Sequence, residues 1–221
     1  MATVLFVVTG ARSWTLADGS SVPTGYWAEE LVAPFEVLAD AGHTVHFATP
    51  GGVRPVADER SLTPEATGGR DLREVLDDLE ELSAPLRLED VDLADYDAVF
   101  YPGGHGPMED LAVDETSGTL ITAAVERDVP LAIVCHGPAA LLASDVTGRT
   151  VTGFSNEEER AGGKADQARW LLEDRLREAG FEVETGPAFE PKVVVDGMLL
   201  TGQNPASSRP LAQRLLEVLP S

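Results

Sequence analysis

Short apolar runs alternate with amphipathic segments along this chain of 221 residues. Residues 3–9 form an apolar, β-branched run, and shorter runs follow at residues 98–101 and 131–134. Between them, the apolar positions of residues 25–42 and 115–128 recur at helical spacing. Strands and helices that alternate in this way predict an α/β fold, with a mostly parallel sheet covered by helices on both faces.

Further elements follow from the same criteria. Strands are predicted at residues 43–49, 150–153, 181–185, 192–195 and 198–201, with a tight hairpin at Asp196-Gly197 between the last two. Helices are predicted over residues 71–82 and 168–179 and in the last residues up to Leu219. The polar, glycine-rich residues 11–24 predict a loop. Pro34 falls inside the pattern of residues 25–42, so that helix should begin near Pro34 or kink there.

Residues 50–97 interrupt the alternation with glycines and prolines, and they are longer than an ordinary α/β connection. We therefore expect an insertion at about residues 50–97 that packs over one end of the sheet. The rest of the chain shows no repeat and no linker, and its length suffices for one well-buried core. The expected organisation is a single domain over residues 1–221.

The charge balance argues against some classes of binding partner. With 16 basic and 38 acidic residues the net charge is −22, which would repel nucleic-acid phosphates and anionic membrane surfaces. No apolar run reaches the length of a membrane span, and the first residues lack the character of a signal peptide. One cysteine excludes an internal disulfide. These features predict a soluble, cytoplasmic protein that binds neither nucleic acid nor membranes.

Residues 131–142 contain the most informative break in the apolar pattern. Four apolar residues run into Cys135, His136 and Gly137 before a small, leucine-rich segment begins. This predicts a buried strand that turns sharply into a helix, with Cys135 at the corner. The positive end of that helix would favour the reactive thiolate form of Cys135. The alternative is a cysteine that serves as a small buried hydrophobe, although a core needs no such polar break.

Three polar segments should meet where the strands end. Residues 26–30, 103–106 and 135–136 are expected in loops at the carboxyl edge of the sheet, where reactive groups collect in such folds. The backbone N–H groups of Gly104 and its neighbouring glycines, with that of His136, could face a developing oxyanion. A simple turn is the alternative for the glycine loop.

Two acidic segments offer carboxylates for this site. Glu30 lies just before a segment that should be buried, so it could hydrogen-bond the sulfur or relay protons, whereas Glu29 should lie in solvent. The acidic run of residues 157–159 is typical of a solvated surface. One of its members could instead hold the ring of His136 in the correct tautomer.

No metal site is expected from the spacing of the ligand-type residues. His105 could reach the site, but the four histidines and the scattered carboxylates follow no pattern known for a catalytic metal.

Five segments, in this order, together resemble the ThiJ/PfpI superfamily, and within it the branch of heat-shock chaperones and glyoxalase III. They are residues 24–35, 103–110, 132–139, 151–159 and 195–207, and they span nearly the whole chain. The resemblance implies a flavodoxin-like three-layer sandwich of the class I glutamine amidotransferase type.

The resemblance also implies roles for individual residues. Cys135 corresponds to the nucleophile and His136 to the adjacent base. Glu159 corresponds to the acid partner of the histidine, and Glu30 to the carboxylate that contacts the sulfur.

Both carboxylate assignments are sensitive to a slip of one residue. Glu158 could take the place of Glu159, and Glu29 could take the place of Glu30.

The reaction implied by the resemblance converts methylglyoxal, or a related 2-oxoaldehyde, to a 2-hydroxy acid without a cofactor. The Cys135 thiolate would add to the aldehyde carbon, and His136 or Glu30 would move a proton between the two substrate carbons through an enediol. Water would then release the acid from a thioester. Backbone N–H groups near Gly104 and His136 would stabilise the oxyanions, and His105 would lie at the same substrate-binding loop.

Two other functions remain open. The first is a stress-response holdase that binds unfolded chains through an apolar surface, with Cys135 as a redox sensor. The second is a cysteine-dependent peptidase or amide hydrolase, which needs an open groove. Relatives of this kind suggest a homodimer.

Overall fold

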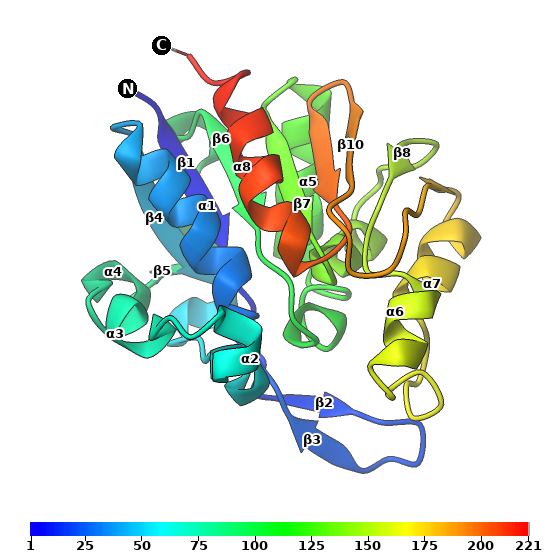
Figure 1. Ribbon diagram of the computed structural model, residues 1–221. Helices are drawn as coiled ribbons and strands as arrows, with labels where there is room; N and C mark the ends of the chain where they lie inside the picture. The colour runs from blue at the N-terminus through cyan, green and yellow to red at the C-terminus, as the bar shows by residue number, and fades with distance from the viewer. Residues whose placement is uncertain (221) are drawn as a thin grey trace.

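A seven-stranded sheet forms the centre of the computed structural model, which describes residues 1–220 (Figure 1). The strands lie in the order β10-β11-β7-β6-β1-β4-β5, and only β10 and β11 pair antiparallel. Their bounds are β1 (Thr3–Val7), β4 (Thr44–Thr49), β5 (Leu86–Arg87), β6 (Ala98–Tyr101), β7 (Leu131–Val134), β10 (Val193–Asp196) and β11 (Leu199–Gly202). The predicted mostly parallel sheet and the hairpin between its last two strands are confirmed.

Helices cover both faces of this sheet, as Figure 1 shows. Helices α1 (Ala28–Asp40) and α8 (Ser208–Leu216) pack side by side on one face. Helices α5 (Glu115–Glu126) and α7 (Leu172–Glu178), with the 3₁₀ helix η6 (Gly137–Ala143), cover the other face. Successive strand residues point to opposite faces, so the apolar strands fill two cores at once. The three-layer α/β architecture predicted from the sequence is therefore confirmed.

Residues 50–97 add to the sheet and cover it. Helices α2 (Pro64–Thr67), α3 (Leu72–Asp77) and α4 (Glu80–Ser83) occupy most of the helical part of this segment. The leucines of α3 and α4 pack into the same core as α1. The short strand β5 then pairs with β4 at the edge of the sheet. The same segment contains four short 3₁₀ turns, η1 (Pro50–Gly52), η2 (Glu59–Leu62), η3 (Leu88–Asp90) and η4 (Leu93–Asp95). Two more lie later in the chain, η5 (Gly106–Met108) and η7 (Pro205–Ser207).

Several predicted boundaries are wrong. The segment 11–24 is not only loop, because β2 (Ser13–Thr15) and β3 (Ser21–Pro23) pair as a hairpin. Strands β8 (Thr150–Val151) and β9 (Glu182–Val183) pair with each other, outside the central sheet. The short helix α6 (Asn156–Ala161) follows β8.

Two predicted helices begin elsewhere. Helix α1 begins at Ala28 and continues through Pro34, which leaves the carbonyl of Glu30 without the N–H donor of an ordinary helix. Helix α7 begins at Leu172 rather than at residue 168, because the backbone of Ala168 pairs with Leu16 instead. Within the described residues, no helix combines the length and the apolar composition that crossing a membrane requires.

Candidate active site

Cys135 lies at a sharp corner between β7 and η6. Its φ of 60° belongs to the left-handed region that residues with a side chain rarely adopt. The backbone is held there from both sides, since the Cys135 N–H donates to the carbonyl of Gly202 at 2.9 Å and the Cys135 carbonyl accepts from Phe154 at 2.8 Å. The predicted corner is confirmed. The segment behind it is a 3₁₀ helix of 7 residues rather than the expected α-helix.

A chain of hydrogen bonds joins the sulfur to a buried carboxylate. The Sγ atom of Cys135 lies 3.3 Å from Nδ1 of His136. On the other side of that ring, Nε2 lies 2.8 Å from Oε2 of Glu159. If Nε2 donates its proton to the carboxylate, Nδ1 keeps a lone pair that can accept the thiol proton. This geometry can therefore deprotonate the cysteine as it attacks.

His105 shares the same carboxylate. Its Nε2 lies 3.0 Å from Oε1 of Glu159, and its Nδ1 lies 3.4 Å from a guanidinium nitrogen of Arg60. Burial, reinforced by the neighbouring His136, lowers the pKa of His105 to about 4, so this ring is neutral near pH 7. Both ring nitrogens are therefore engaged within the protein, and the role of His105 in binding substrate stays a prediction.

Glu159 remains ionised although it is 5% exposed. Burial alone would raise its pKa, but the hydrogen bonds with His105 and His136 outweigh burial and hold that pKa well below the usual range of a carboxyl. One negative charge therefore orients two imidazole rings.

Aromatic rings stack on the faces of these imidazoles. The rings of Trp14, His105, His136 and Phe154 follow one another with centroid separations of 4.3, 4.2 and 4.4 Å. Such stacking restricts rotation of both imidazoles. No local pattern signals this arrangement, because the polar, glycine-rich residues around Trp14 are typical of a loop.

Glu30 is a second side chain that contacts the sulfur. It is fully buried, and its Oε2 accepts the backbone N–H of Gly103 at 2.8 Å. Burial raises the pKa of Glu30 to about 8, although hydrogen bonds with Cys135 and Gly103 oppose the shift. The carboxyl is therefore mostly protonated near pH 7. Its Oε1 has no other partner, so a neutral Glu30 can donate a hydrogen bond to the sulfur.

The charge state of Cys135 differs from the expectation. Burial, and next the negative charge that Glu30 carries when ionised, raise the pKa of the Cys135 thiol well above its ordinary value. The backbone N–H of Gly104 acts in the opposite direction. The prediction that the following helix keeps the sulfur ionised is therefore wrong, because loss of water outweighs a short 3₁₀ helix. The geometry instead offers two groups that can assist formation of the thiolate, the His136 ring as a proton acceptor and a neutral Glu30 as a hydrogen-bond donor.

The two neighbouring glutamates point elsewhere. Glu158 caps the start of α6 by accepting from Ser155, and it also accepts from the side chains of Gln203 and Asn204. Glu29 is half-buried, and its nearest charges include Arg70 and Arg209. The geometry thus brings Glu30 and Glu159, and neither of these neighbours, to the site.

The glycine loop approaches the site more closely than a side chain would permit. A Cβ at Gly103 would lie 2.6 Å from Oε2 of Glu30 and 2.7 Å from the backbone nitrogen of His136. At Gly104 a Cβ would lie 2.4 Å from the carbonyl of Gly25, and φ there is 91°. The close packing requires glycine at both positions and brings the backbone of the loop next to the site, whereas its role as an oxyanion donor stays a prediction.

His105, His136 and Glu159 also form a group of potential metal ligands. One ligand atom from each lies within 4.8 Å of the others. These atoms already hydrogen-bond one another, so a metal would have to replace the two N–H protons that the carboxylate accepts. Spacing along the chain could not reveal this group, because it combines three separate segments.

The burial of Glu30 predicts a specific pH dependence of stability. The pKa of this carboxyl is ordinarily 4.5 and is about 8 in the fold, so its contribution to stability is present below pH 4.5 and is lost progressively as the pH rises to about 8. Glu30→Gln removes this titration. We expect the free energy of unfolding of the wild type, relative to that of Glu30→Gln, to fall between these pH values. Denaturant titrations of both proteins would measure it, and parallel pH profiles would contradict the assignment.

Comparison with known proteins places this geometry in a family context. Residues 22–218 match a family model described as the DJ-1/PfpI family. A protein/nucleic acid deglycase HchA of Staphylococcus aureus is 27% identical over 95% of this chain and 77% of its own length. Glyoxalase 3 of Candida albicans is 26% identical over 98% of both chains.

Solved structures agree with the fold. The rapid encystment protein of Francisella tularensis is 27% identical, covers both chains completely and superposes with a TM-score of 0.88. The glyoxalase III structure from Candida albicans superposes with a TM-score of 0.81 over 99% of this chain and 98% of the other, at 23% identity, and this likeness concerns the fold alone.

Proposed function

The chain belongs to the DJ-1/PfpI family, and we propose that it is a glyoxalase III-like enzyme. In this proposal it converts methylglyoxal or a related 2-oxoaldehyde to a 2-hydroxy acid without a cofactor. The observation that carries the proposal is the hydrogen-bonded chain from Cys135 through His136 to Glu159, with a neutral Glu30 at the sulfur. Two relatives that match almost the whole chain, a glyoxalase 3 and a deglycase, support the same class of substrate.

The first step forms a bond between sulfur and carbon. The thiol proton of Cys135 passes to Nδ1 of His136 while Sγ attacks the aldehyde carbon. The product is a hemithioacetal whose oxygen gains a proton. The backbone N–H groups of Gly104 and His136 stabilise the negative oxygen in the transition state, a contribution of about 3 kcal/mol per donor.

The second step moves hydrogen within the substrate. A base removes the proton from the former aldehyde carbon, and the resulting enediol is protonated at the neighbouring carbon, so the two carbons exchange oxidation level without an external oxidant. Glu30 suits this role once it has given its proton to the hemithioacetal oxygen, because a carboxyl with a pKa of about 8 can both give and accept a proton near neutral pH. The result is a thioester of the 2-hydroxy acid.

Hydrolysis completes the cycle. Water attacks the thioester carbonyl, the bond between carbon and sulfur breaks, and the Cys135 thiol is regenerated with release of the acid. The His136–Glu159 pair is positioned to activate this water, because the same ring can take up a proton again. All atoms come from the aldehyde and one water.

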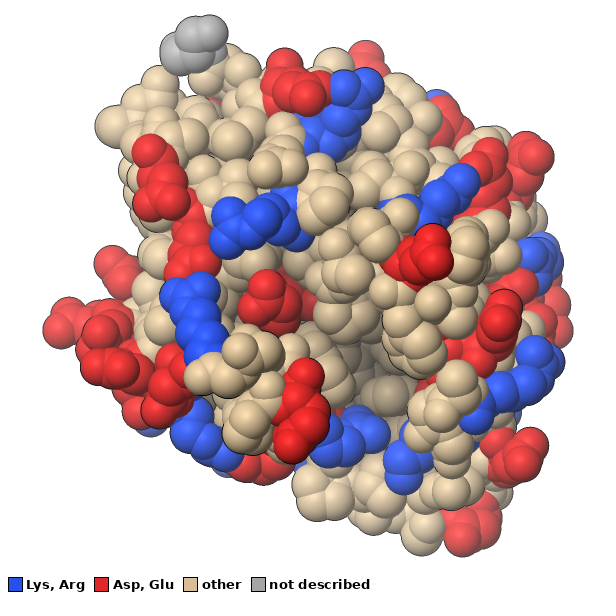
Figure 2. All heavy atoms as spheres, viewed as in Figure 1, with Lys and Arg blue, Asp and Glu red and all other residues tan. Residues whose placement is uncertain are grey.

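A nearly buried sulfur fits a small substrate better than a polypeptide. Cys135 is 3% exposed and His136 is 2% exposed. Figure 2 shows a hollow between α2 and α6, beyond the carboxyl end of β7, with charged side chains around its rim. So little exposure of the sulfur disfavours the peptidase or amide hydrolase alternative, which requires room for an extended chain.

The direct test is an assay of the wild-type protein with methylglyoxal and no glutathione. We expect D- or L-lactate in an amount equal to the methylglyoxal consumed, detected by a stereospecific lactate assay. Consumption of methylglyoxal without any lactate would contradict the proposal, because it would indicate only adducts with the protein.

The name of the Staphylococcus aureus relative raises nucleic acid as an alternative substrate. The net charge of −22 argues against tight binding of a phosphate backbone. We therefore propose the free aldehyde as the substrate. The same assay with added duplex DNA as a competitor should leave the rate of lactate formation unchanged.

The holdase alternative predicts a different response to substitution. A holdase should still suppress aggregation of a denatured client protein when Cys135 is replaced by alanine, whereas the enzyme should lose lactate formation. Large apolar side chains exposed among residues 1–220 include Val53, Val113 and Phe189, and these come from separate segments. We further propose that the protein acts in the cytoplasm as a homodimer; analytical ultracentrifugation would measure the oligomeric state.

A further inference from the structure

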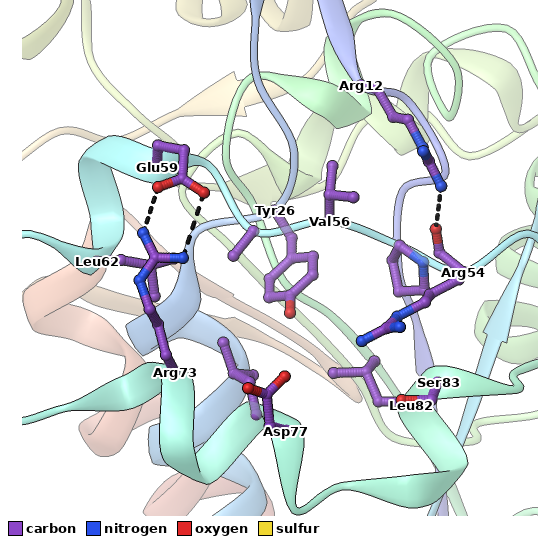
Figure 3. Close-up of a pocket in the computed structure, with 13 residues that line it drawn as sticks. Arg12, Tyr26, Arg54, Val56, Glu59, Leu62, Arg73, Asp77, Leu82 and Ser83 are labelled. Carbon is purple, nitrogen blue, oxygen red and sulfur yellow. Dashed lines mark hydrogen bonds and ion pairs between the residues drawn. The ribbon is translucent and has the colours of Figure 1, made fainter.

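A second cavity lies apart from the reactive sulfur. Its volume is about 460 Å³, and its walls come from residues 54–62, from α3 and α4, and from Arg12 and Tyr26 (Figure 3). Neither Cys135 nor the residues hydrogen-bonded around it line this cavity. The catalytic chemistry proposed above therefore does not account for it.

Tyr26 presents an unpaired hydroxyl to this cavity. The residue is 3% exposed, and its hydroxyl forms no hydrogen bond with any residue of the described chain. In Figure 3 the hydroxyl points into the middle of the cavity. A hydroxyl that faces a cavity and has no partner within the protein can hydrogen-bond a bound molecule, so Tyr26 offers a polar contact to a ligand.

Two guanidinium groups in the same wall lack acidic partners. Most arginines of this acidic chain pair with a carboxylate, and Arg73 in the opposite wall pairs with Glu59. By contrast, no carboxylate within the described residues forms an ion pair with Arg12 or Arg54. Arg12 instead donates to the backbone carbonyl of Arg54 at 3.2 Å, which holds the two residues together. Figure 3 shows the Arg54 guanidinium turned toward Tyr26.

Apolar and polar residues share the remaining walls, and the polar ones are Glu59, Arg73, Asp77 and Ser83. Leu76 and Leu82 line the cavity, and Figure 3 shows Leu82 and Asp77 below Tyr26. Arginine forks match the two oxygens of a carboxylate, and the leucines favour a short aliphatic group.

We propose that this cavity binds a small carboxylic acid with a branched aliphatic tail. The carboxylate lies on Arg12 and Arg54, the tail lies on Leu76 and Leu82, and a polar atom of the ligand accepts from Tyr26. The ligand could be a free amino acid or a simple carboxylic acid, since both share this chemistry. The proposal goes beyond the function proposed above and does not depend on it.

Calorimetric titration of the full chain with 4-methylpentanoate and with L-leucine tests the proposal. The two probes share the carboxylate and the aliphatic tail and differ in the ammonium group. We expect Arg54→Gln to weaken binding about tenfold and Tyr26→Phe to weaken it severalfold. Arg169→Gln is the matched control, because Arg169 is exposed, has no acidic partner in the described part of the chain and lies outside the cavity.

Each outcome decides a point. Binding of either probe that weakens in Arg54→Gln and Tyr26→Phe, but not in the control, supports the site. Tighter binding of leucine would further place its ammonium beside Asp77. The proposal is overturned if neither probe binds at millimolar concentration, if the cavity variants bind like the wild type, or if inorganic phosphate competes equally well. Because calorimetry measures binding at this cavity and not catalysis, a negative result would not contradict the lactate formation proposed above.

Discussion

Replacement of Cys135 by alanine should reduce lactate formation from methylglyoxal to the uncatalysed background, a loss of at least about 10³-fold. The thiol is the group that forms the bond with the aldehyde carbon in the proposed reaction, and the described chain contains no second cysteine to replace it. Binding of the aldehyde in the pocket would remain, but without the sulfur no thioester can form. A stereospecific lactate assay with purified wild type and variant, both without glutathione, measures this loss.

The matched variant is Cys135→Ser, which keeps a nucleophilic atom of similar size beside His136. Its activity should also be very low, because a serine hydroxyl is far harder to deprotonate than a thiol. Neither substitution should unfold the protein, since alanine and serine meet the same backbone strain at a φ of 60° as cysteine does. Thermal unfolding serves as the control. More than a tenth of wild-type activity in the folded alanine variant would refute the role of Cys135.

Replacement of Glu159 by glutamine should lower kcat by about 10²- to 10⁴-fold with little change in fold. The carboxylate accepts hydrogen bonds from two rings, His105 and His136, one on each oxygen. A glutamine has a single carbonyl oxygen, and its NH₂ group would face the other ring as a donor. If that ring is His136, its proton must move to Nδ1, which then cannot accept the proton of Cys135.

Glu157→Gln provides the control for this experiment. Glu157 lies on the same helix, α6, and its substitution removes the same charge. The side chain of Glu157 is exposed and does not contact either imidazole. Its kcat should match that of the wild type. Equal losses in both variants would indicate a general effect of charge and would contradict the assigned role of Glu159. The ¹⁵N chemical shifts of the His136 ring would report the change of tautomer directly.

The two carboxyl groups of the site act in opposite protonation states for a physical reason. Glu30 is fully buried and its polar contacts come from one backbone N–H and the sulfur, so burial dominates and its pKa rises to about 8. Glu159 receives two hydrogen bonds from imidazoles, which outweigh its burial and lower its pKa. Carboxyl groups separated in this way can serve as a proton carrier and as a fixed negative charge.

The sequence by itself determined the architecture and pointed to Cys135 as the candidate nucleophile. Apolar runs at residues 3–9, 98–101 and 131–134 could only be buried strands, because each ends at glycine, proline or the Cys135 corner and alternates with a helical pattern. The polar break at Cys135 marked the corner without any knowledge of its surroundings. These features are local, so the order of residues is enough to specify them.

Only the tertiary structure decided the charge state of Cys135 and which carboxyl groups lie near it. Glu30 and Glu159 are far apart in the sequence from each other and from Cys135, and their distinction from Glu29 and Glu158 depends on which face of α1 and α6 turns inward. The pKa of the sulfur depends on burial by all of these segments together, and it shifts in the direction opposite to that expected from the helix alone. Desolvation and hydrogen bonding are properties of the assembled fold, so no local pattern could have specified them.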